Sequence, residues 1–146
     1  MKAFVRCMMC LISVSLIGGC EGFDLGGLLG SSRVTVELVN NGNLPVQVEI
    51  YIADEQLIPE ALLTSVGEKI EITVDPDSTE RVSRDCDELQ ALIIEEARVM
   101  IAGLPGPGDD TEVLRDGDDF SCGDTVTFTF EYLPVPIALN ISQSVN

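Results

Sequence analysis

The chain has 146 residues, of which 45% are hydrophobic, so it holds enough material for one folded domain with a single core. Eight Lys and Arg residues stand against 25 Asp and Glu residues, which gives a formal net charge of −17 at pH 7. Phosphate backbones repel so acidic a chain, and we expect no nucleic-acid partner. The sequence has no His and no Trp, which excludes imidazole catalysis, His-ligated metals and His-activated nucleophiles. We therefore predict a protein that is not an enzyme.

The first nineteen residues have the layout of a secretory signal peptide. Lys2 and Arg6 precede a mostly apolar run over residues 7–17, and small residues follow it. This order of charge, apolar run and small residues is typical of export signals. The run is too short and too interrupted for a membrane span, which needs about 20 apolar residues.

A short motif closes this segment: Leu16-Ile17-Gly18-Gly19-Cys20. It resembles the lipobox of bacterial lipoprotein precursors, in which an aliphatic residue and small residues precede the cysteine that is lipidated. The resemblance implies that residues 1–19 are removed and that Cys20 carries a diacylglycerol and an amide-linked acyl chain such as palmitate. Several acyl chains together anchor a protein stably. The resemblance thus implies a membrane partner at the bacterial cell envelope, and Glu21 after the cysteine implies the outer membrane.

The five cysteines divide between this segment and the rest of the chain. Cys7 and Cys10 lie inside the signal peptide, and the lipid would occupy Cys20. Cys86 and Cys122 remain, and two thiols in an oxidising exported compartment predict one disulfide.

Residues 20–32 connect the anchor to the rest of the chain and are rich in Gly and Ser. We interpret them as the lipidated cysteine and a flexible tether, and a coil of this length has a root-mean-square reach of roughly 17 to 21 Å. Residues 33–146 form the predicted folded domain.

From residue 33 onward, apolar residues alternate with polar ones, which is the period of a β-strand with one buried face. Segments 34–38 and 46–52 flank the turn residues 40–43, and we interpret them as a hairpin. Residues 59–66 predict a short helix, with Pro59 in its first turn and Gly67 as its stop.

The next segments continue this pattern. Residues 70–74 predict a strand, residues 75–78 a turn and residues 79–84 a short return strand. Residues 89–101 fit both a helical face and a strand broken at residues 95–96. We favour the strand because its neighbours are strands, and we expect a turn cluster at residues 103–108.

Residues 125–130 give the clearest strand pattern, with Val and Phe alternating with Thr. Residues 135–141 follow with prolines at positions 134 and 136, which suits an edge strand because proline cannot donate to a ladder. Together these segments predict an all-β fold: a single antiparallel β-sandwich of about seven strands, Ig-like in general architecture, with one short helix.

Acidic residues surround the two remaining cysteines. Residues 82–89 and 113–120 share the pattern Val-x-Arg-Asp-x-acid-acid-apolar. A disulfide brings these segments together, because bonded cysteines have Cα atoms about 4.4 to 6.8 Å apart. Seven carboxylates would then crowd one end of the domain: Asp85, Asp87, Glu88, Asp116, Asp118, Asp119 and Asp124. Their repulsion is relieved by solvation, by pairing with Arg84 and Arg115, or by a hard cation such as Ca²⁺.

These features predict a lipid-anchored, exported cell-envelope protein with a non-enzymatic binding or structural domain. Its ligand, protein or carbohydrate, is not specified by the sequence. The alternative is a Ca²⁺-dependent adhesion or ligand-binding module that uses the acidic loops around Cys86 and Cys122 as metal ligands. No cofactor is expected apart from calcium in that alternative.

Overall fold

The computed structural model describes residues 32–134 and 137–146. The predicted signal peptide, the predicted lipidation site Cys20 and nearly all of the predicted tether lie outside the described residues. The described part contains one helix, α1 (Glu60–Val66), and nine strands. The strands are β1 (Arg33–Asn40), β2 (Val46–Ala53), β3 (Glu68–Val74), β4 (Ser78–Asp85), β5 (Ala91–Ile101), β6 (Leu104–Asp109), β7 (Leu114–Arg115), β8 (Thr125–Pro134) and β9 (Ile137–Val145).

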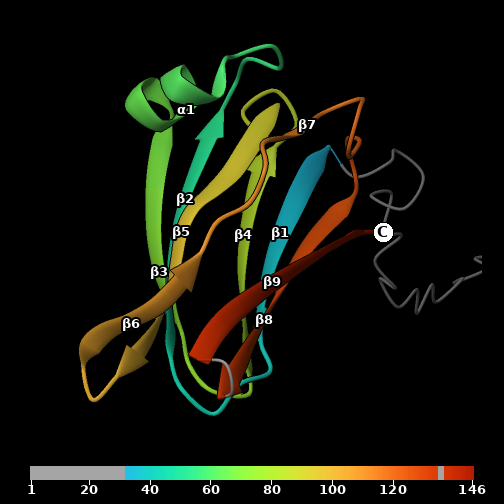
Figure 1. Ribbon diagram of the computed structural model, residues 1–146. Helices are drawn as coiled ribbons and strands as arrows, with labels where there is room; N and C mark the ends of the chain where they lie inside the picture. The colour runs from blue at the N-terminus through green and yellow to red at the C-terminus, as the bar shows by residue number, and fades with distance from the viewer. Residues whose placement is uncertain (1–31, 135–136) are drawn as a thin grey trace, which may run out of the picture.

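The strands form two sheets that face each other (Figure 1). One sheet has the order β4-β1-β8-β9, and the other has the order β3-β2-β5-β6, with β7 also paired to β5. The predicted all-β sandwich with one short helix is confirmed. One pair departs from the antiparallel prediction, because β1 runs parallel to β8 with Thr35 opposite Thr125. Both strands start at the same end of the sandwich and therefore run in the same direction.

The core lies between the two sheets and follows the alternation seen in the sequence. Buried side chains occupy every second position of β1, from Val34 to Leu38, and of β8, from Val126 to Phe130. The second sheet contributes Ile50, Ile52 and further aliphatic residues of β2 and β5. Burial of a large apolar side chain contributes about 1.5 to 3 kcal/mol.

The predicted hairpin between residues 34–38 and 46–52 is wrong. β1 and β2 belong to different sheets, and the chain crosses from one sheet to the other between Asn40 and Val46. The same holds for β3 and β4, whose connection also crosses between sheets. In each pair, both strands turn an apolar face toward the shared core. The alternation of apolar and polar residues is therefore the same whether the two strands form a hairpin or lie in opposite sheets.

The strand predicted over residues 89–101 is confirmed as β5. Its register against β2 shifts beside Glu49, where Glu96 faces Glu49 and Ile94 faces Ile50. Glu95 is the extra residue of a β-bulge, which explains the break in the sequence pattern. Ile93 is buried on the outer face of the sheet, because α1 covers it there.

The turn cluster predicted over residues 103–108 is wrong, since Leu104–Asp109 forms β6. The turn itself is confined to Ala102 and Gly103, which have φ values of 51° and 78°. Gly108 of β6 lies close to β5. A Cβ at this position would lie 2.7 Å from the carbonyl oxygen of Ala97.

The predicted helix is confirmed as α1. The backbone N–H of Gly67 donates to the carbonyl oxygen of Leu63 at 2.9 Å and closes the last turn. Leu63 is buried against Ile93 and Ile58 in a second, smaller core on the outer face of the sheet. No helix within residues 32–134 and 137–146 is long and apolar enough to span a bilayer. The last strand, β9, is an edge strand as predicted, but it begins at Ile137. Pro134 is the last residue of the interior strand β8, so it does not explain the edge position of β9.

Candidate functional site

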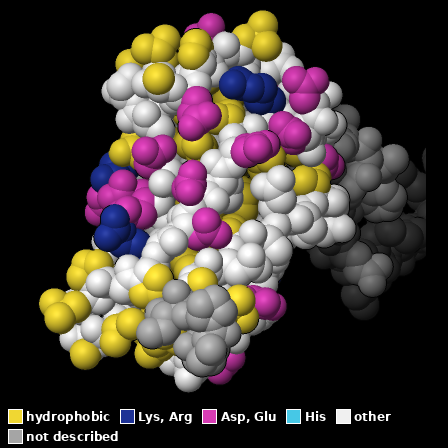
Figure 2. Space-filling view, viewed as in Figure 1, with side chains coloured by type: hydrophobic (Ala, Val, Ile, Leu, Met, Phe, Trp, Pro, Cys, Tyr) yellow, Lys and Arg dark blue, Asp and Glu magenta, His cyan; other side chains and the backbone are white. Residues whose placement is uncertain are grey.

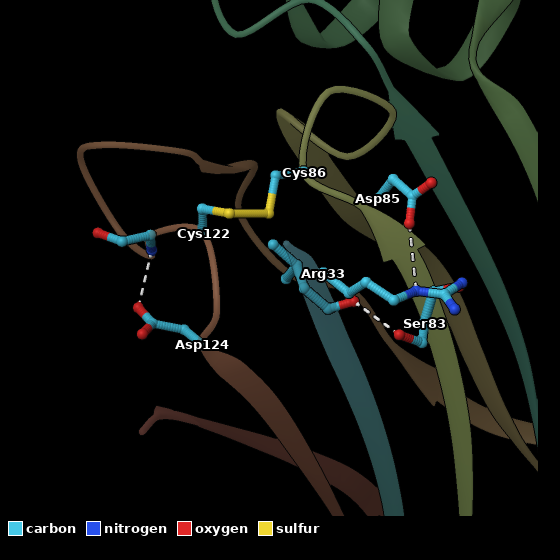
Figure 3. The surroundings of a disulfide bond; sticks show 8 residues. Arg33, Ser83, Asp85, Cys86, Cys122 and Asp124 are labelled. Carbon is cyan, nitrogen blue, oxygen red and sulfur yellow. Dashed lines mark hydrogen bonds and ion pairs between the residues drawn. A yellow bond between two sulfur atoms is a disulfide. The ribbon is translucent and has the colours of Figure 1, made fainter. Parts of the chain in front are cut away.

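The disulfide joins Cys86 to Cys122, with an S–S distance of 2.05 Å and a Cα–Cα distance of 5.4 Å. The predicted pairing is confirmed, and Figure 3 shows the bond between the end of β4 and the loop before β8. The backbone N–H of Cys86 donates to the carbonyl oxygen of Ser32 at 3.0 Å. We call this the disulfide end of the sandwich, where Ser32, Asp85, Cys86 and Cys122 lie and β1 begins.

Three of the seven acidic residues predicted to crowd this end have separate partners. Asp85 forms an ion pair with Arg33, with Oδ1 and Nε 3.3 Å apart. Asp124 accepts a hydrogen bond from the backbone N–H of Ser121 at 2.8 Å, and both contacts are drawn in Figure 3. Asp119 accepts from the backbone N–H of Arg115 at 2.9 Å. Each of these three carboxylates therefore has its own partner, either Arg33 or a backbone N–H group of the loops.

The other four carboxylates point to solvent to differing degrees. Asp87, Glu88 and Asp118 are exposed, and Asp116 is half-buried. Among the described residues, no group of three or more Cys, Asp and Glu side chains is arranged to hold a metal ion. Calcium binding by these loops stays a prediction.

The disulfide end also carries a cleft of about 390 Å³ that the sequence did not predict. Its apolar wall comes from Ile52, Ala53 and Ile58, at the end of β2 and in the connection that follows. Residues from four further places complete it: Asp54 and Glu55 after β2, Val66 and Gly67 at the end of α1, Glu68 in β3, and Arg84 and Glu88 near the cysteine. The lining of the cleft therefore holds four carboxylates and one guanidinium.

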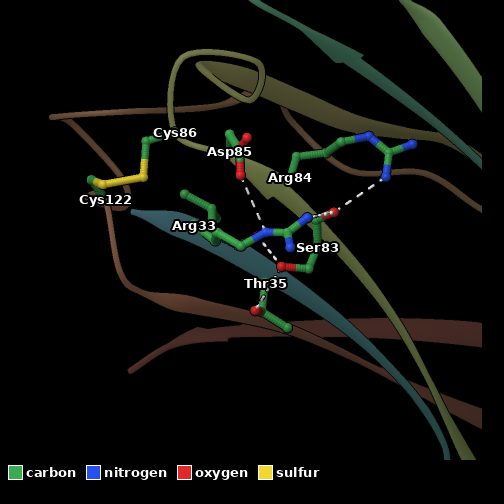
Figure 4. Close-up of polar contacts among 8 residues, drawn as sticks. Arg33, Thr35, Ser83, Arg84, Asp85, Cys86 and Cys122 are labelled. Atoms are coloured by element: carbon green, nitrogen blue, oxygen red, sulfur yellow. Dashed lines mark hydrogen bonds and ion pairs between the residues drawn. A yellow bond between two sulfur atoms is a disulfide. The ribbon is translucent and has the colours of Figure 1, made fainter. Parts of the chain in front are cut away.

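Arg84 connects the two sheets across this cleft. Its Nη2 lies 2.6 Å from Oε1 of Glu68, and its Nε donates to Oε2 of the same carboxylate at 3.4 Å. The hydrogen bonds that Arg84 donates to this carboxylate raise the pKa of Arg84 above its ordinary value. Arg84 also donates to the carbonyl oxygen of Ser83 at 3.2 Å (Figure 4). Its main carboxylate partner is therefore in β3, outside the acidic loops.

Arg115 holds the connection between β2 and α1 in place. Its Nη2 donates to the carbonyl oxygen of Ile58 at 2.9 Å, and its Nη1 donates to the carbonyl oxygen of Gln56. The side chain of Gln56 donates in turn to the carbonyl oxygen of Asp116. Arg115 therefore positions one wall of the cleft, a role that differs from the predicted pairing with acidic side chains.

Gly67 allows α1 to approach β2 beside the cleft. A Cβ at this position would lie 2.5 Å from the carbonyl oxygen of Leu63 and 2.8 Å from that of Ile52. The sequence predicted Gly67 only as the residue that ends the helix. The close approach to β2 depends on tertiary contacts that no local pattern encodes.

The cleft has the character of a binding site for a cationic group. Its carboxylates outnumber its guanidinium by four to one, and that guanidinium is already paired with Glu68. Buried aliphatic side chains beside the carboxylates provide an apolar surface for a hydrocarbon stem, such as that of Lys or Arg.

No family model matches the sequence, and no curated protein matches it. Solved structures show a distant likeness. The T6SS lipoprotein TssJ1 from Pseudomonas aeruginosa is 14% identical, with a TM-score of 0.43 over 78% of this chain and 97% of that chain. A protein from Eubacterium rectale is 10% identical, with a TM-score of 0.43 over 76% and 87% of the two chains. Wild-type pneumolysin is 11% identical, with a TM-score of 0.43 over 78% of this chain and 23% of that chain. These likenesses assign no function.

Proposed function

We propose that the protein is exported, anchored by lipid at Cys20 in the bacterial cell envelope, and acts as a non-enzymatic binding or structural module on the outer membrane. The observation that carries the proposal is the division of the cysteines. Cys86 and Cys122 bond to each other inside the domain. This pairing leaves Cys20, which ends the motif that resembles a lipobox, to accept the lipid, and a structural disulfide fits an oxidising compartment.

Fractionation of cells that express the full chain tests the anchor. The wild-type chain is expected in the membrane fraction, and Cys20→Ala is expected to lose this association because no thiol remains to accept the lipid. Cys10→Ala is the matched control, since this cysteine lies in the predicted signal peptide. Equal membrane association of Cys20→Ala and the wild type would contradict the anchor.

The cleft supports a binding role over a purely structural one. A small cationic probe such as agmatine, with a guanidinium on a short hydrocarbon stem, matches the cleft in charge and in apolar surface. In NMR titrations of the labelled protein, agmatine should shift the backbone signals of residues 52–55, 66–68 and 84–88. Glu55→Gln with Glu88→Gln should weaken this response, and Glu131→Gln, an exposed position in β8, should not. Equal responses of the two variants would argue against the cleft.

A further inference from the structure

Helix α1 and the connection before it expose an unusual amount of apolar surface. Leu57 is 76% exposed, Leu62 is 51% exposed and Val66 is 71% exposed. Leu62 and Val66 are four residues apart and therefore lie on one face of the helix. Figure 2 shows hydrophobic side chains grouped over α1 at the upper end of the domain. We call Leu57, Leu62 and Val66 the α1 patch.

The α1 patch lies at the end of the sandwich where the chain enters. The cleft joins Val66 of α1 to Arg84 and Glu88, on either side of Cys86. Cys86 is hydrogen-bonded to Ser32, the first described residue. The polypeptide that leads to Cys20 therefore meets the domain at the disulfide end.

The length of that connection keeps the disulfide end close to the anchor. Twelve residues separate Cys20 from Arg33, and they span at most about 43 Å when fully extended. A flexible chain of this length has a root-mean-square span of roughly 17 to 21 Å. The eight residues of β1 carry the opposite end of the sandwich about 26 Å further along the strand direction.

We infer that the α1 patch rests on the lipid surface of the membrane that holds Cys20, so that the disulfide end faces the bilayer and the opposite end points away from it. This inference rests on the proposed anchor. The anchor holds the domain at the surface and makes contact with lipid an intramolecular event, so three exposed aliphatic side chains are enough to bias its orientation.

Other apolar side chains are exposed at the opposite end, and they provide the discriminating comparison. Leu104, beside the turn between β5 and β6, is 69% exposed. It matches the α1 patch in chemistry and exposure but lies far from the point where the chain enters. Lipid contact driven by hydrophobicity alone would involve Leu104 as well, whereas contact set by the anchor involves only the α1 patch.

The charges around the α1 patch set the kind of lipid it favours. Glu60 lies in the helix, and Asp54, Glu55 and Glu68 line the neighbouring cleft. Anionic headgroups repel these carboxylates. The contact should therefore be strongest on zwitterionic phosphatidylethanolamine and weaker as anionic lipid is added.

Single-tryptophan fluorescence tests the inference, because the natural chain has no Trp. Lipidated Leu62→Trp and Leu104→Trp chains, which begin at Cys20, are reconstituted into phosphatidylethanolamine vesicles, with and without brominated acyl chains. Leu62→Trp should shift its emission to shorter wavelength and be quenched by the brominated lipid. Leu104→Trp should behave as in solution. Leu57→Trp is a second reporter if Leu62→Trp does not fold, as judged by circular dichroism.

Each outcome separates the inference from its premise. Intact mass of each preparation reports whether lipid is attached to Cys20. Attached lipid without a shift at Leu62 or Leu57 overturns the inference and leaves the anchor in place, and so does an equal response at Leu104. A shift that grows with protein density at fixed lipid composition indicates a second copy on the patch and also overturns it. Preparations without lipid overturn both the anchor and the inference.

Discussion

The two ends of the sandwich are closed in different ways. At the disulfide end, a covalent bond joins Cys86 to Cys122 amid acidic loops. The opposite end, which we call the hairpin end, holds Asn40, the turn between β5 and β6, and the turn between β3 and β4. There the side chain of Asn40, only 1% exposed, joins the connection between β1 and β2 to the one between β3 and β4. Its Nδ2 lies 2.8 to 3.1 Å from the carbonyl oxygens of Leu44, Val74 and Asp75, and its Oδ1 accepts from Gly42 N–H at 2.9 Å.

The two ends also differ in charge. At the hairpin end, residues 39–48 and 99–108 contain no charged side chain, and the turn between β3 and β4 adds Asp75 and Asp77. Residues 39–48 and 99–108 meet there, because Met100 N–H donates to the carbonyl oxygen of Pro45 at 2.8 Å, and Asn41 N–H donates to that of Phe130 at 3.1 Å. This chain therefore fixes its connections between the sheets with a disulfide at one end and with the buried neutral amide of Asn40 at the other.

Removal of the disulfide should have the largest effect. Cys86→Ala with Cys122→Ala frees a loop with a sequence separation of 36 residues, which should lower the free energy of unfolding by about 3.8 kcal/mol through unfolded-state entropy. Denaturant unfolding measures this loss, and hydrogen exchange should rise first at the disulfide end. The wild-type chain unfolded in the presence of reductant serves as the control and should lose a similar free energy. Faster exchange confined to the hairpin end would contradict the comparison.

Asn40→Ala should have the next largest effect. The substitution leaves buried carbonyl oxygens without their donor, and we expect a loss of about 3 kcal/mol in the free energy of unfolding. Reductant should not change the difference in free energy of unfolding between Asn40→Ala and the wild type, because the disulfide lies at the other end of the domain. Asn140→Ala, at an exposed position of β9, should cost less than about 0.5 kcal/mol. Similar losses for the two Asn variants would remove the role assigned to Asn40.

Gly67→Ala probes the packing of α1 at the disulfide end. The added Cβ would meet the carbonyl oxygens of Leu63 and Ile52, so the helix must shift, at a cost of about 2 kcal/mol. Thermal unfolding reports the loss. Ser65→Ala in the same helix should stay within about 0.5 kcal/mol of the wild type. A neutral Gly67→Ala would show that α1 does not need its close approach to β2.

Removal of a Cβ at the hairpin end should stabilise the domain, whereas addition of a Cβ at Gly67 should destabilise it. Ala102 has a φ of 51°, which is strained for a residue with a Cβ, and Ala102→Gly should stabilise the domain by about 0.5 kcal/mol. Ala61→Gly, in the exposed part of α1, should destabilise it by about 0.5 to 1 kcal/mol. Paired melting curves measure both changes, and a loss at both positions would refute the strain at Ala102.

Calcium should have the smallest effect on either end. Arg33 and the loop backbone already contact Asp85, Asp119 and Asp124. We therefore expect millimolar calcium to shift the melting temperature by less than about 1 °C. A rise of several degrees, lost on Asp118→Asn with Asp119→Asn, would instead favour the calcium-dependent module.

Much of the fold could be predicted from the sequence because burial imposes a two-residue period on each strand. This period placed β1, β2, β3 and β8 and decided the strand in residues 89–101. It could not decide which strands share a sheet. Val34 and Ile50 face the same core from opposite sheets, and their local patterns are alike.

The site was less predictable than the fold. Counting thiols was enough to pair Cys86 with Cys122, because few combinations remain after the lipobox is assigned. The cleft and the partners of Arg84 and Arg115 depend on the approach of β3 to β4 and on the path of residues 54–59, which sequence spacing does not specify. Acidic composition suggested one crowded cluster, whereas short local hydrogen bonds take up Asp119 and Asp124 separately.

The most direct test of the account is the intact mass of the chain extracted from membranes without reductant and treated with a thiol-alkylating reagent. The account predicts one species that begins at Cys20, carries the mass of a diacylglycerol and an acyl chain, and takes up no alkylating reagent at Cys86 or Cys122. A chain that retains Met1, or that is alkylated at both Cys86 and Cys122, would contradict it.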